Sequence, residues 1–275
     1  MSCSESDYAY LRGLVLKESA NEIDPSRNAL FDTRLTPMAR LAGAQNLREF
    51  VKVLRTDKES QLHRAVAEAM TINETSFFRD RLPFEMLRET VIPELIARRS
   101  KARKLRIWSA ACSTGQEAYS VAMLLRENFP ELADWDVKII GTDISRLAVE
   151  AARAGRYRRI DVNRGLPVRM LVKYLERDGE VWVMSPAMRE MCGFVEANLC
   201  GALAWLPVFD LVLLRNVLLY FPRHERGRVF AEVQRHITTD GYLLLGNAEQ
   251  AEDSTKLFEV QFASGCYVYR PSSGA

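Results

Sequence analysis

The 275-residue sequence predicts a doubly wound α/β domain that follows a small all-α domain. Up to about Met70 the apolar residues recur at helical spacing. From about Leu105 short, almost continuous apolar runs alternate with amphipathic stretches, which is typical of parallel strands covered by helices on both faces. Near the end of the chain two apolar runs flank Ser264-Gly265, a dipeptide that favours a hairpin turn. We therefore predict a helical domain over residues 1–72 and an α/β domain over 73–275 whose sheet ends in an antiparallel edge.

The helical domain is expected to contain several amphipathic segments, because each one repeats its apolar residues on one face. They are centred on Tyr10–Leu16, Leu35–Leu41, Asn46–Leu54 and Leu62–Met70. Basic residues accompany the second and third segments. They form either an ordinary solvated helix face or a surface that attracts an acidic partner, and they comprise Arg34, Arg40, Arg48, Lys52 and Arg55.

The α/β domain is defined by its predicted strands and by the helices between them. The strands are expected over Leu105–Ala110, Val137–Thr142, Phe209–Leu214, Tyr242–Leu245, Phe258–Phe262 and Cys266–Tyr269. The helices are expected over Glu117–Phe129, Ser145–Ala154 and Arg223–Ile237. The alternation stops between about Tyr157 and Gly193, where Asp178-Gly179 predicts the turn of a β-hairpin. We interpret this stretch, about 157–193, as a small inserted β subdomain.

The composition excludes several classes of protein. Lys and Arg total 38 against 36 Asp and Glu, a balance that argues against extensive nucleic-acid binding. The five cysteines form no C-x-x-C pair and the chain has three histidines, so no metal site is expected. No apolar run approaches the roughly 20 residues of a membrane span, and the polar start lacks the features of a signal peptide. We expect a cytoplasmic protein without membrane insertion, and a monomer because the sequence suggests no coiled coil.

A candidate cofactor site follows the first predicted strand. The residues from Ser109 to Glu117 are small and lead directly into a helix, which lets the backbone approach a ligand closely. They lack the G-x-G-x-x-G pattern of dinucleotide binders, and the carboxylate of Glu117 would repel a phosphate at the start of this helix. A nicotinamide dehydrogenase is therefore disfavoured. Glu117 either binds the cationic amine of a ligand or complements the helix dipole.

Polar residues also follow the later strands, at the same predicted edge of the sheet. Asp143 comes directly after the second strand, where a carboxylate can accept hydrogen bonds from both hydroxyls of a ribose. Its alternative role is to cap the next helix, a task that Ser145 can also perform. The segments Glu196–Leu199 and Arg215–Pro222 place further polar groups beside this cleft, although either asparagine alternatively caps a loop.

Ordered motifs run along the chain. Asn73–Asp80 reads NETSFFRD and Trp108–Glu117 reads WSAACSTGQE. Further along lie Gly141–Ser145, Asn198-Leu199, Arg215–Val217 with Tyr220-Phe221, and Gly241–Gly246. In this order they resemble the CheR-type chemoreceptor methyltransferase family, with its signatures N-E-T-x-F-F-R-[DE] and W-S-A-x-x-S-x-G-x-E. The resemblance covers nearly the whole chain and implies a class I, Rossmann-like methyltransferase domain behind a helical domain.

This resemblance implies that the chain transfers the methyl group of S-adenosylmethionine (SAM) to glutamate side chains of bacterial chemoreceptors, leaving S-adenosylhomocysteine. The partner would be the cytoplasmic helical domain of the receptors. Arg79 suits the carboxylate of SAM because its fork can pair with it bidentately. The residues expected to line the SAM pocket are Asn73, Thr75, Arg79, Glu117, Asp143, Asn198, Leu199, Arg215, Asn216 and Val217.

We also predict two residues on the acceptor side of the site. The hydroxyl of Tyr220 is expected to orient the acceptor carboxylate, with packing in the core as its alternative role. Arg98, in the Arg98-Arg99 pair, is expected to steer the acceptor. Two other functions stay open at this point. A class I methyltransferase acting on a small molecule or another protein would not need the basic helical domain, and a SAM-sensing scaffold would not need an acceptor cleft.

Overall fold

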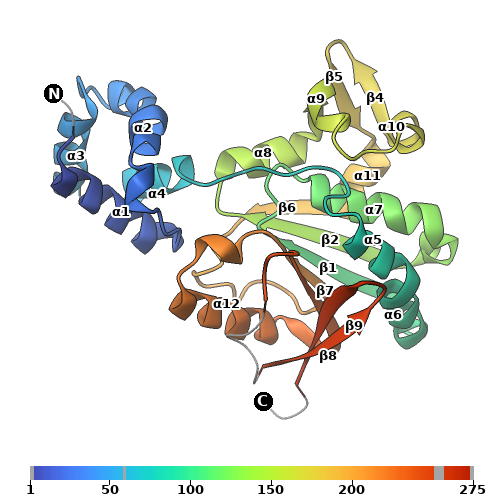
Figure 1. Cartoon of the computed structure of the whole chain (residues 1–275). Helices are drawn as coiled ribbons and strands as arrows, with labels where there is room; N and C mark the ends of the chain where they lie inside the picture. Colours follow the sequence, from blue (N-terminus) through green and yellow to red (C-terminus); the bar gives the residue numbers. More distant parts are fainter. Residues whose placement is uncertain (1–2, 58–59, 251–256, 273–275) are drawn as a thin grey trace. The chain divides into compact units, whose positions relative to one another are not determined.

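The computed structural model describes residues 3–57, 60–250 and 257–272 (Figure 1). The chain forms two compact units, one of Met1–Ile72 with Leu219–Glu225 and one of Asn73–Leu218 with Arg226–Ala275. The first unit is helical, and the second contains both β-sheets. In the part of the chain that the structure describes, no helix combines the length and the apolar character needed to cross a membrane.

The first unit packs its helices around one apolar core. Its helices are α1 (Glu5–Ser19), η1 (Pro25–Arg27), α2 (Ala29–Leu41), α3 (Leu47–Thr56) and α4 (Ser60–Ala69). α1 begins at a capping box, in which the hydroxyl of Ser4 accepts from the N–H of Asp7 and the Asp7 carboxylate accepts from the N–H of Ser4. Leu11, Phe31 and Phe50 are fully buried, so α1, α2 and α3 each turn an apolar face inward, as the spacing in the sequence predicts.

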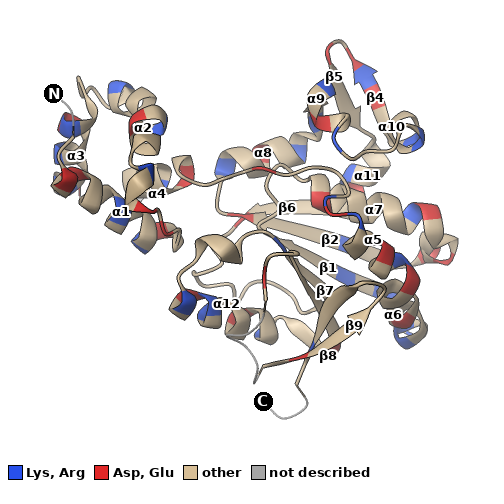
Figure 2. Ribbon diagram, viewed as in Figure 1, with Lys and Arg blue, Asp and Glu red and all other residues tan. Residues whose placement is uncertain are grey.

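Figure 2 shows Lys and Arg on several helices of this unit, and the basic residues predicted for it divide into two groups by their contacts. Arg34 donates to two backbone carbonyls at the end of α4, at 2.8 and 3.3 Å. Arg48 and Arg55 lie 3.9 and 3.7 Å from the carboxylate of Asp7. These three side chains therefore stabilise the unit itself, a role that the sequence does not reveal. Arg40 and Lys52 are exposed and make no such contact with the residues that the structure describes.

The second unit is organised around a seven-stranded sheet with the order β6-β2-β1-β7-β8-β10-β9 (Figure 1). The strands are β1 (Lys104–Ala110), β2 (Asp136–Asp143), β6 (Cys192–Glu196), β7 (Phe209–Leu214), β8 (Ile237–Leu245), β9 (Phe258–Ala263) and β10 (Cys266–Pro271). β6, β2, β1, β7 and β8 run parallel, whereas β10 pairs antiparallel with both β8 and β9. Ser264 and Gly265 have φ angles of 46° and 79°, as a tight turn between β9 and β10 requires. The predicted doubly wound fold with an antiparallel C-terminal edge is confirmed.

The helices of the second unit lie against this sheet. α6 (Ile92–Arg99) and α7 (Gln116–Asn128) contact β1, and α8 (Arg146–Ala154) contacts β2 and β6. The remaining helical segments of this unit are α5 (Leu82–Met86), η2 (Leu87–Val91), η3 (Pro130–Asp134) and α11 (Pro186–Met191). η4 (Leu218–Tyr220) and α12 (Arg223–Arg235) each have residues in both units. No element was predicted over 82–99. Pro83 and Pro93 suggest breaks there, but each occupies the first turn of a helix, where proline is tolerated.

The inserted subdomain contains the predicted hairpin and one strand more. Its sheet has the order β3-β5-β4, with β3 (Arg156–Arg158), β4 (Leu175–Asp178) and β5 (Val181–Met184) all antiparallel. Gly179 takes a φ of 60° in the turn between β4 and β5. Two short helices complete the subdomain, α9 (Arg159–Val162) and α10 (Val168–Tyr174). The strand β3 was not predicted because two of its three residues are charged.

An ion-pair cluster around Arg99 joins the amino-terminal ends of the central strands. The Nε of Arg99 donates to Asp210 at 2.6 Å, and its Nη atoms donate to Asp240 at 2.7 and 2.5 Å. Asp210 also accepts from the backbone N–H of Arg106 at 2.8 Å. The hydrogen bonds from Arg99, opposed in part by burial, lower the pKa of Asp240 to about 2.

We expect the substitution Asp240→Asn to lower stability mainly near neutral pH. The folded state holds the pKa of Asp240 at about 2, below the value of about 3.9 in an unfolded chain. The contribution of this carboxylate is therefore complete above the unfolded value and is lost as the pH falls through the folded value. Urea unfolding midpoints of wild type and variant should differ near pH 6, and the difference should shrink below about pH 4 and vanish toward about pH 2. Asp178→Asn is the control, because its ion pair with Arg156 is exposed. A difference that does not change with pH would contradict this assignment.

Candidate cofactor and active site

The register of the parallel strands places the predicted site residues at one edge of the sheet. Ala110 in β1 pairs with Thr142 in β2 and with Leu214 in β7, and Leu214 pairs with Leu245 in β8. The residues that follow these positions therefore lie side by side at the carboxyl ends of the strands. In open α/β sheets this edge is where ligands bind. It carries Ala111, Asp143, Arg215 and Gly246.

The loop after β1 is tightly folded and needs small residues. Ala111, Ser113 and Gly115 have φ angles of 59°, 50° and 92°. A Cβ atom at Gly115 would lie 2.9 Å from the Cβ of Ala152, and one at Gly141 would lie 2.6 Å from the ring of Phe194. The backbone at the ends of β1 and β2 therefore packs too closely to admit larger residues at these two glycines, as expected for a loop that approaches a ligand.

Asp143 is held in place by the two loops that it joins. Its carboxylate is 6% exposed, and its oxygens accept from the N–H groups of Ser113 at 2.8 Å and Ser145 at 2.9 Å. The cap of α8 is Ser145, whose hydroxyl accepts from the N–H of Ala148. The alternative considered from the sequence, in which Asp143 caps that helix, is therefore not what the structure shows. A carboxylate can accept several hydrogen bonds at once, so Asp143 is chemically suited to accept from the hydroxyls of a ligand.

Glu117 and Arg215 form a buried ion pair. One carboxylate oxygen of Glu117 accepts from the hydroxyl of Ser109 at 2.7 Å, and the other accepts from Arg215 Nη1 at 2.8 Å. Arg215 Nη2 also donates to the Asp80 carboxylate at 3.0 Å and to the Arg79 carbonyl at 2.9 Å. The side chain of Arg215 is only 1% exposed, and its Nε–H has no hydrogen-bond partner within the described part of the chain. Arg215 therefore links the segments that carry Glu117 and Asp80, and its contact with the cofactor stays a prediction from the sequence.

The segment Asn73–Asp80 is fixed against the loop after β1 and against α7. The carbonyl of Asn73 accepts from the Ser113 hydroxyl at 2.9 Å, and the N–H of Phe78 donates to the Ser120 hydroxyl at 2.9 Å. Arg79 is half-buried and donates to the carbonyl of Glu74. The structure therefore brings the segment that carries Asn73, Thr75 and Arg79 to the same edge as Glu117 and Asp143.

The loop after β6 adjoins Asp143 through the backbone. The N–H of Ala197 donates to the Asp143 carbonyl at 2.8 Å. The side chain of Asn198 accepts from the N–H of Cys200 at 2.9 Å, which fixes a local turn. Leu199 is buried. Both residues thus lie in a loop at the predicted edge, and the turn-forming role that the sequence left open for Asn198 is present.

Asn216 and Val217 follow β7 and are held by a residue that the sequence did not indicate. Their N–H groups donate to the carboxylate of Glu249, at 2.6 and 2.7 Å. Glu249 is buried, and its partners are backbone groups. Backbone donors carry no sequence signal, so the pairing was not predictable from residue types.

The two residues predicted on the acceptor side are placed differently. Arg98 lies at the amino-terminal edge of the sheet, where it donates to Glu94 at 2.5 Å, to the hydroxyl of Tyr242 at 3.0 Å and to the carbonyl of Asp240. It is at the opposite end of the strands from Asp143, so it does not belong to the proposed site. Tyr220 belongs to the first unit by its contacts. The role of its hydroxyl in orienting the acceptor carboxylate remains a prediction from the sequence.

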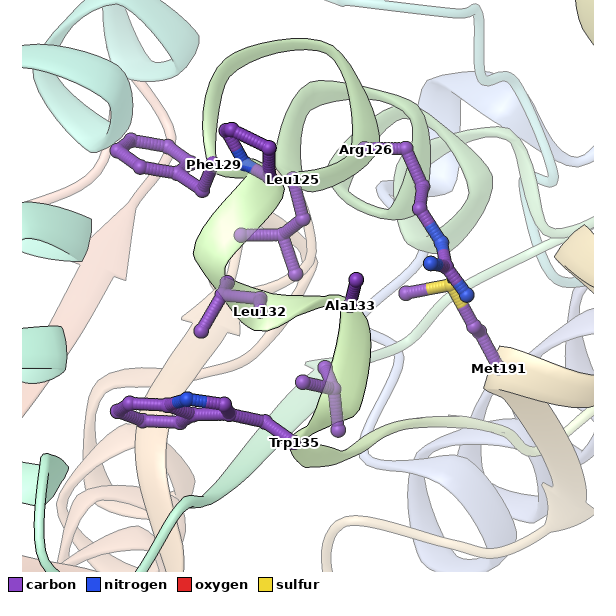
Figure 3. Close-up of a pocket in the computed structure, with 9 residues that line it drawn as sticks. Leu125, Arg126, Phe129, Leu132, Ala133, Trp135 and Met191 are labelled. Atoms are coloured by element: carbon purple, nitrogen blue, oxygen red, sulfur yellow. The ribbon is translucent and has the colours of Figure 1, made fainter.

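A small pocket also lies away from the carboxyl edge (Figure 3). It has a volume of about 250 Å³, and Figure 3 shows Leu125, Leu132 and Trp135 pointing into it. Val137, near the start of β2, belongs to its lining. The pocket therefore opens at the amino-terminal end of β2 and is separate from the site at Asp143. No group of His, Cys, Asp and Glu suited to a metal ion occurs among the residues that the structure describes.

The inserted subdomain contacts the loop after β1 through Tyr157. Its hydroxyl donates to the carbonyl of Thr114 at 2.9 Å. Its ring packs edge-on against the ring of Phe77, with 5.0 Å between the two ring centroids. Tyr157 is 2% exposed, and burial raises the pKa of its hydroxyl well above the usual range. The hydroxyl is therefore a permanent donor to this loop.

We expect Tyr157→Phe to loosen the loop without unfolding the protein. The change leaves the buried carbonyl of Thr114 without this partner, at a cost of about 1 kcal/mol. The free energy of unfolding should fall by that amount, and the Kd for SAM should rise up to about fivefold. Calorimetric titration with SAM measures the second effect. Tyr267→Phe is the matched control because Tyr267 is 60% exposed. Equal Kd values for the two variants would show that Tyr157 does not support the loop.

The strand order, with its antiparallel final strands and with carboxylates at the ends of β1 and β2, is the architecture of a class I SAM-dependent methyltransferase. The family model described as "CheR methyltransferase, SAM binding domain" matches residues 73–266. The chain belongs to the CheR methyltransferase family. The family and the cofactor predicted from the sequence motifs are confirmed.

Relatives match along almost the whole chain. Chemotaxis protein methyltransferase 1 of Pseudomonas aeruginosa is 34% identical over 275 residues, which span 98% of this chain and 99% of the relative. Chemotaxis protein methyltransferase Cher2 of Pseudomonas putida is 34% identical over 254 residues, 90% of this chain and 92% of the relative. Among solved structures, the glycopeptide N-methyltransferase MtfA in complex with SAM is 17% identical, with a TM-score of 0.34 and 66% of each chain covered.

Proposed function

We propose that this chain transfers the methyl group of SAM to glutamate side chains in the cytoplasmic helical domain of chemoreceptors. The products are glutamyl methyl esters and S-adenosylhomocysteine. The observation that carries the proposal is the pair of fixed carboxylates in a CheR-family chain, Glu117 in the first turn of α7 and Asp143 at the end of β2. The match to chemotaxis methyltransferases over 98% of the chain supports the choice of acceptor.

The residues at the carboxyl edge fit SAM in chemical type. Asp143 offers a carboxylate for the ribose hydroxyls, and Glu117 offers one for the amine of the methionine moiety. Arg79 offers a planar fork for the methionine carboxylate. The loop after β1 is built from small residues, from Ala111 to Gly115, which lets its backbone approach a ligand closely. The other residues proposed to line the pocket are Asn73, Thr75, Asn198, Leu199, Asn216 and Val217.

The residues of this chain orient the reactants, and none of them needs to transfer a proton. Bound SAM supplies a methyl group on a positively charged sulfur, which is already a good leaving group. A glutamate side chain is ionised at neutral pH, with a reference pKa of about 4.3, so the acceptor needs no general base. The site residues must hold the acceptor in line with the methyl group and exclude water, and such positioning can lower a barrier by about 7 to 11 kcal/mol. We propose that the hydroxyl of Tyr220 orients the acceptor carboxylate.

The charge of the first unit indicates the surface that would bind the receptor. The methylated receptor region is expected to be a helical bundle with acidic faces, and the exposed Arg40 and Lys52 of the first unit would attract it at long range. We place the protein in the cytoplasm, where this receptor region lies, and expect it to act as a monomer.

A transfer assay tests the proposed function. SAM with a radiolabelled methyl group is incubated with the protein and with membranes that contain candidate receptors, and the label on the receptors is treated with mild base. Release of the label as methanol is expected, because a glutamyl methyl ester is base-labile. The labelling should disappear in Asp143→Ala. Tight SAM binding without any labelled receptor would instead point to another acceptor or to a SAM-sensing scaffold.

A further inference from the structure

A buried carboxylate with an unusual set of partners lies at the carboxyl edge of the sheet. Glu249 is 7% exposed and follows the end of β8 at Leu245. One of its oxygens accepts from the N–H groups of Val217 and Leu218, both at 2.7 Å. The other accepts from the N–H groups of Asn216 at 2.6 Å and Gly246 at 2.8 Å. One side chain thus gathers three consecutive N–H groups from the segment after β7 and one from the end of β8.

This arrangement stabilises a backbone conformation that the segment would otherwise avoid. Asn216 has a φ of 61°, in the left-handed region, which asparagine adopts at a smaller cost than most other non-glycine residues. N–H groups that donate to an ionised carboxylate form hydrogen bonds roughly twice as strong as neutral ones. Four such bonds at 2.6 to 2.8 Å therefore outweigh the cost of the turn at Asn216. The same bonds balance the burial of the charge.

The end of β8 is shaped to admit this carboxylate. A Cβ atom added at Gly246 would lie 2.6 Å from the Glu249 carboxylate and 2.8 Å from the N–H nitrogen of Asn216. Both distances are shorter than a Cβ atom tolerates, so a side chain at position 246 would displace the carboxylate or the segment after β7. Gly246 and Glu249 therefore act together.

The segment held by Glu249 belongs to the proposed SAM pocket. It carries Asn216 and Val217, and the register places it beside the loops that carry Glu117 and Asp143. Glu249 touches the segment through backbone N–H groups, so its effect on the site does not depend on the side chains of the segment. A small change at Glu249 would alter the direction of the chain at the point where the pocket wall is formed.

We infer that Glu249 is a positioning residue for methyl transfer: its carboxylate sets residues 216–218 in the conformation that SAM binding requires. The inference rests on the proposed function only in assigning Asn216 and Val217 to the SAM pocket. It differs from a purely structural role in one measurable way. A structural role lowers the folded fraction, whereas a positioning role also weakens SAM binding in the molecules that remain folded.

The test compares Glu249→Gln with Glu131→Gln in the full chain. The carboxamide keeps the size of the side chain, but its NH2 group must face two N–H donors that now lack an acceptor. Glu131 is exposed and serves as the control for the same chemical change. Calorimetric titration with SAM gives both the Kd and the number of binding-competent molecules. We expect the Kd of Glu249→Gln to rise at least tenfold and that of Glu131→Gln to stay within twofold of wild type.

A second variant keeps the inference testable if Glu249→Gln does not fold. Gly246→Ala retains the carboxylate but crowds it, so its Kd for SAM should rise in the same direction, and it decides the question if Glu249→Gln does not fold. A folded Glu249→Gln or Gly246→Ala with a Kd within twofold of wild type would overturn the inference. Methyl transfer by the wild type is measured in the same preparation. A wild type that binds SAM but labels no receptor contradicts the proposed acceptor and leaves the Kd comparison valid.

Discussion

Arg215→Met should destabilise the second unit by about 3 kcal/mol, because removal of one partner from a buried ion pair leaves the other charge unpaired. The guanidinium pairs with Glu117 at 2.8 Å and with Asp80 at 3.0 Å, and these carboxylates are 13% and 28% exposed. Methionine fills a similar volume but donates no hydrogen bond. Urea unfolding of wild type and variant, followed by tryptophan fluorescence, measures the change in stability.

A matched control and a second substitution identify the cause. Arg146→Met removes an exposed i,i+4 ion pair with Glu150 and should cost no more than about 0.5 kcal/mol. Adding Glu117→Gln to Arg215→Met removes the more buried of the two stranded carboxylates and should restore part of the stability, although SAM binding stays weak. No recovery in this double variant would show that packing around Arg215, and not charge, determines the loss.

Asp143→Ala is expected to raise the Kd for SAM at least 100-fold. In the proposed pocket this carboxylate binds two ribose hydroxyls, and a hydrogen bond to a charged acceptor contributes about 1.5 to 3 kcal/mol. The carboxylate is also fixed by the N–H groups of Ser113 and Ser145, so it needs no reorganisation when a ligand arrives. Methyl transfer should fall with the affinity at low SAM concentration.

The control for this variant lies on the same strand. Asp136→Ala changes the exposed end of β2, where the carboxylate pairs with Arg106. Its Kd for SAM should equal that of wild type. Asp143→Ala with an intact fold and a Kd within threefold of wild type would remove Asp143 from the proposed ribose contact.

The fold could be predicted where the sequence repeats a simple pattern. Phe209–Leu214 is apolar at five of its six positions, which predicts a strand inside a parallel sheet, and the structure buries all six. β8 was predicted to start at Tyr242 but begins at Ile237. The polar run from Thr238 to Gly241 suggests a turn, and the structure accommodates it by a shift in the register with β7 after Phe209. Tertiary pairing thus extended a strand that local composition did not support.

The candidate site could be predicted in part for a related reason. Residues that follow a predicted strand can be located from the sequence, so Glu117 and Asp143 could be predicted to lie at the carboxyl edge of the sheet. The partners that fix them were not. The sequence did not indicate that Arg215 is buried against Glu117, and Glu249 was missed because its partners among the described residues are backbone groups. Such contacts depend on which strands are neighbours, and the residue types alone do not specify that.

The order of the strands also has a consequence for biosynthesis. β1 lies in the middle of the sheet, yet one of its neighbours, β7, is made about a hundred residues later, since Ile107 pairs with Leu211. During translation β1 can pair with β2 while its other edge stays open until β7 leaves the ribosome. An uncovered apolar edge of this kind attracts chaperones and other nascent chains. Long-range pairing of this type also slows folding. The yield of active enzyme in the cell should therefore depend on the rate of elongation between β2 and β7.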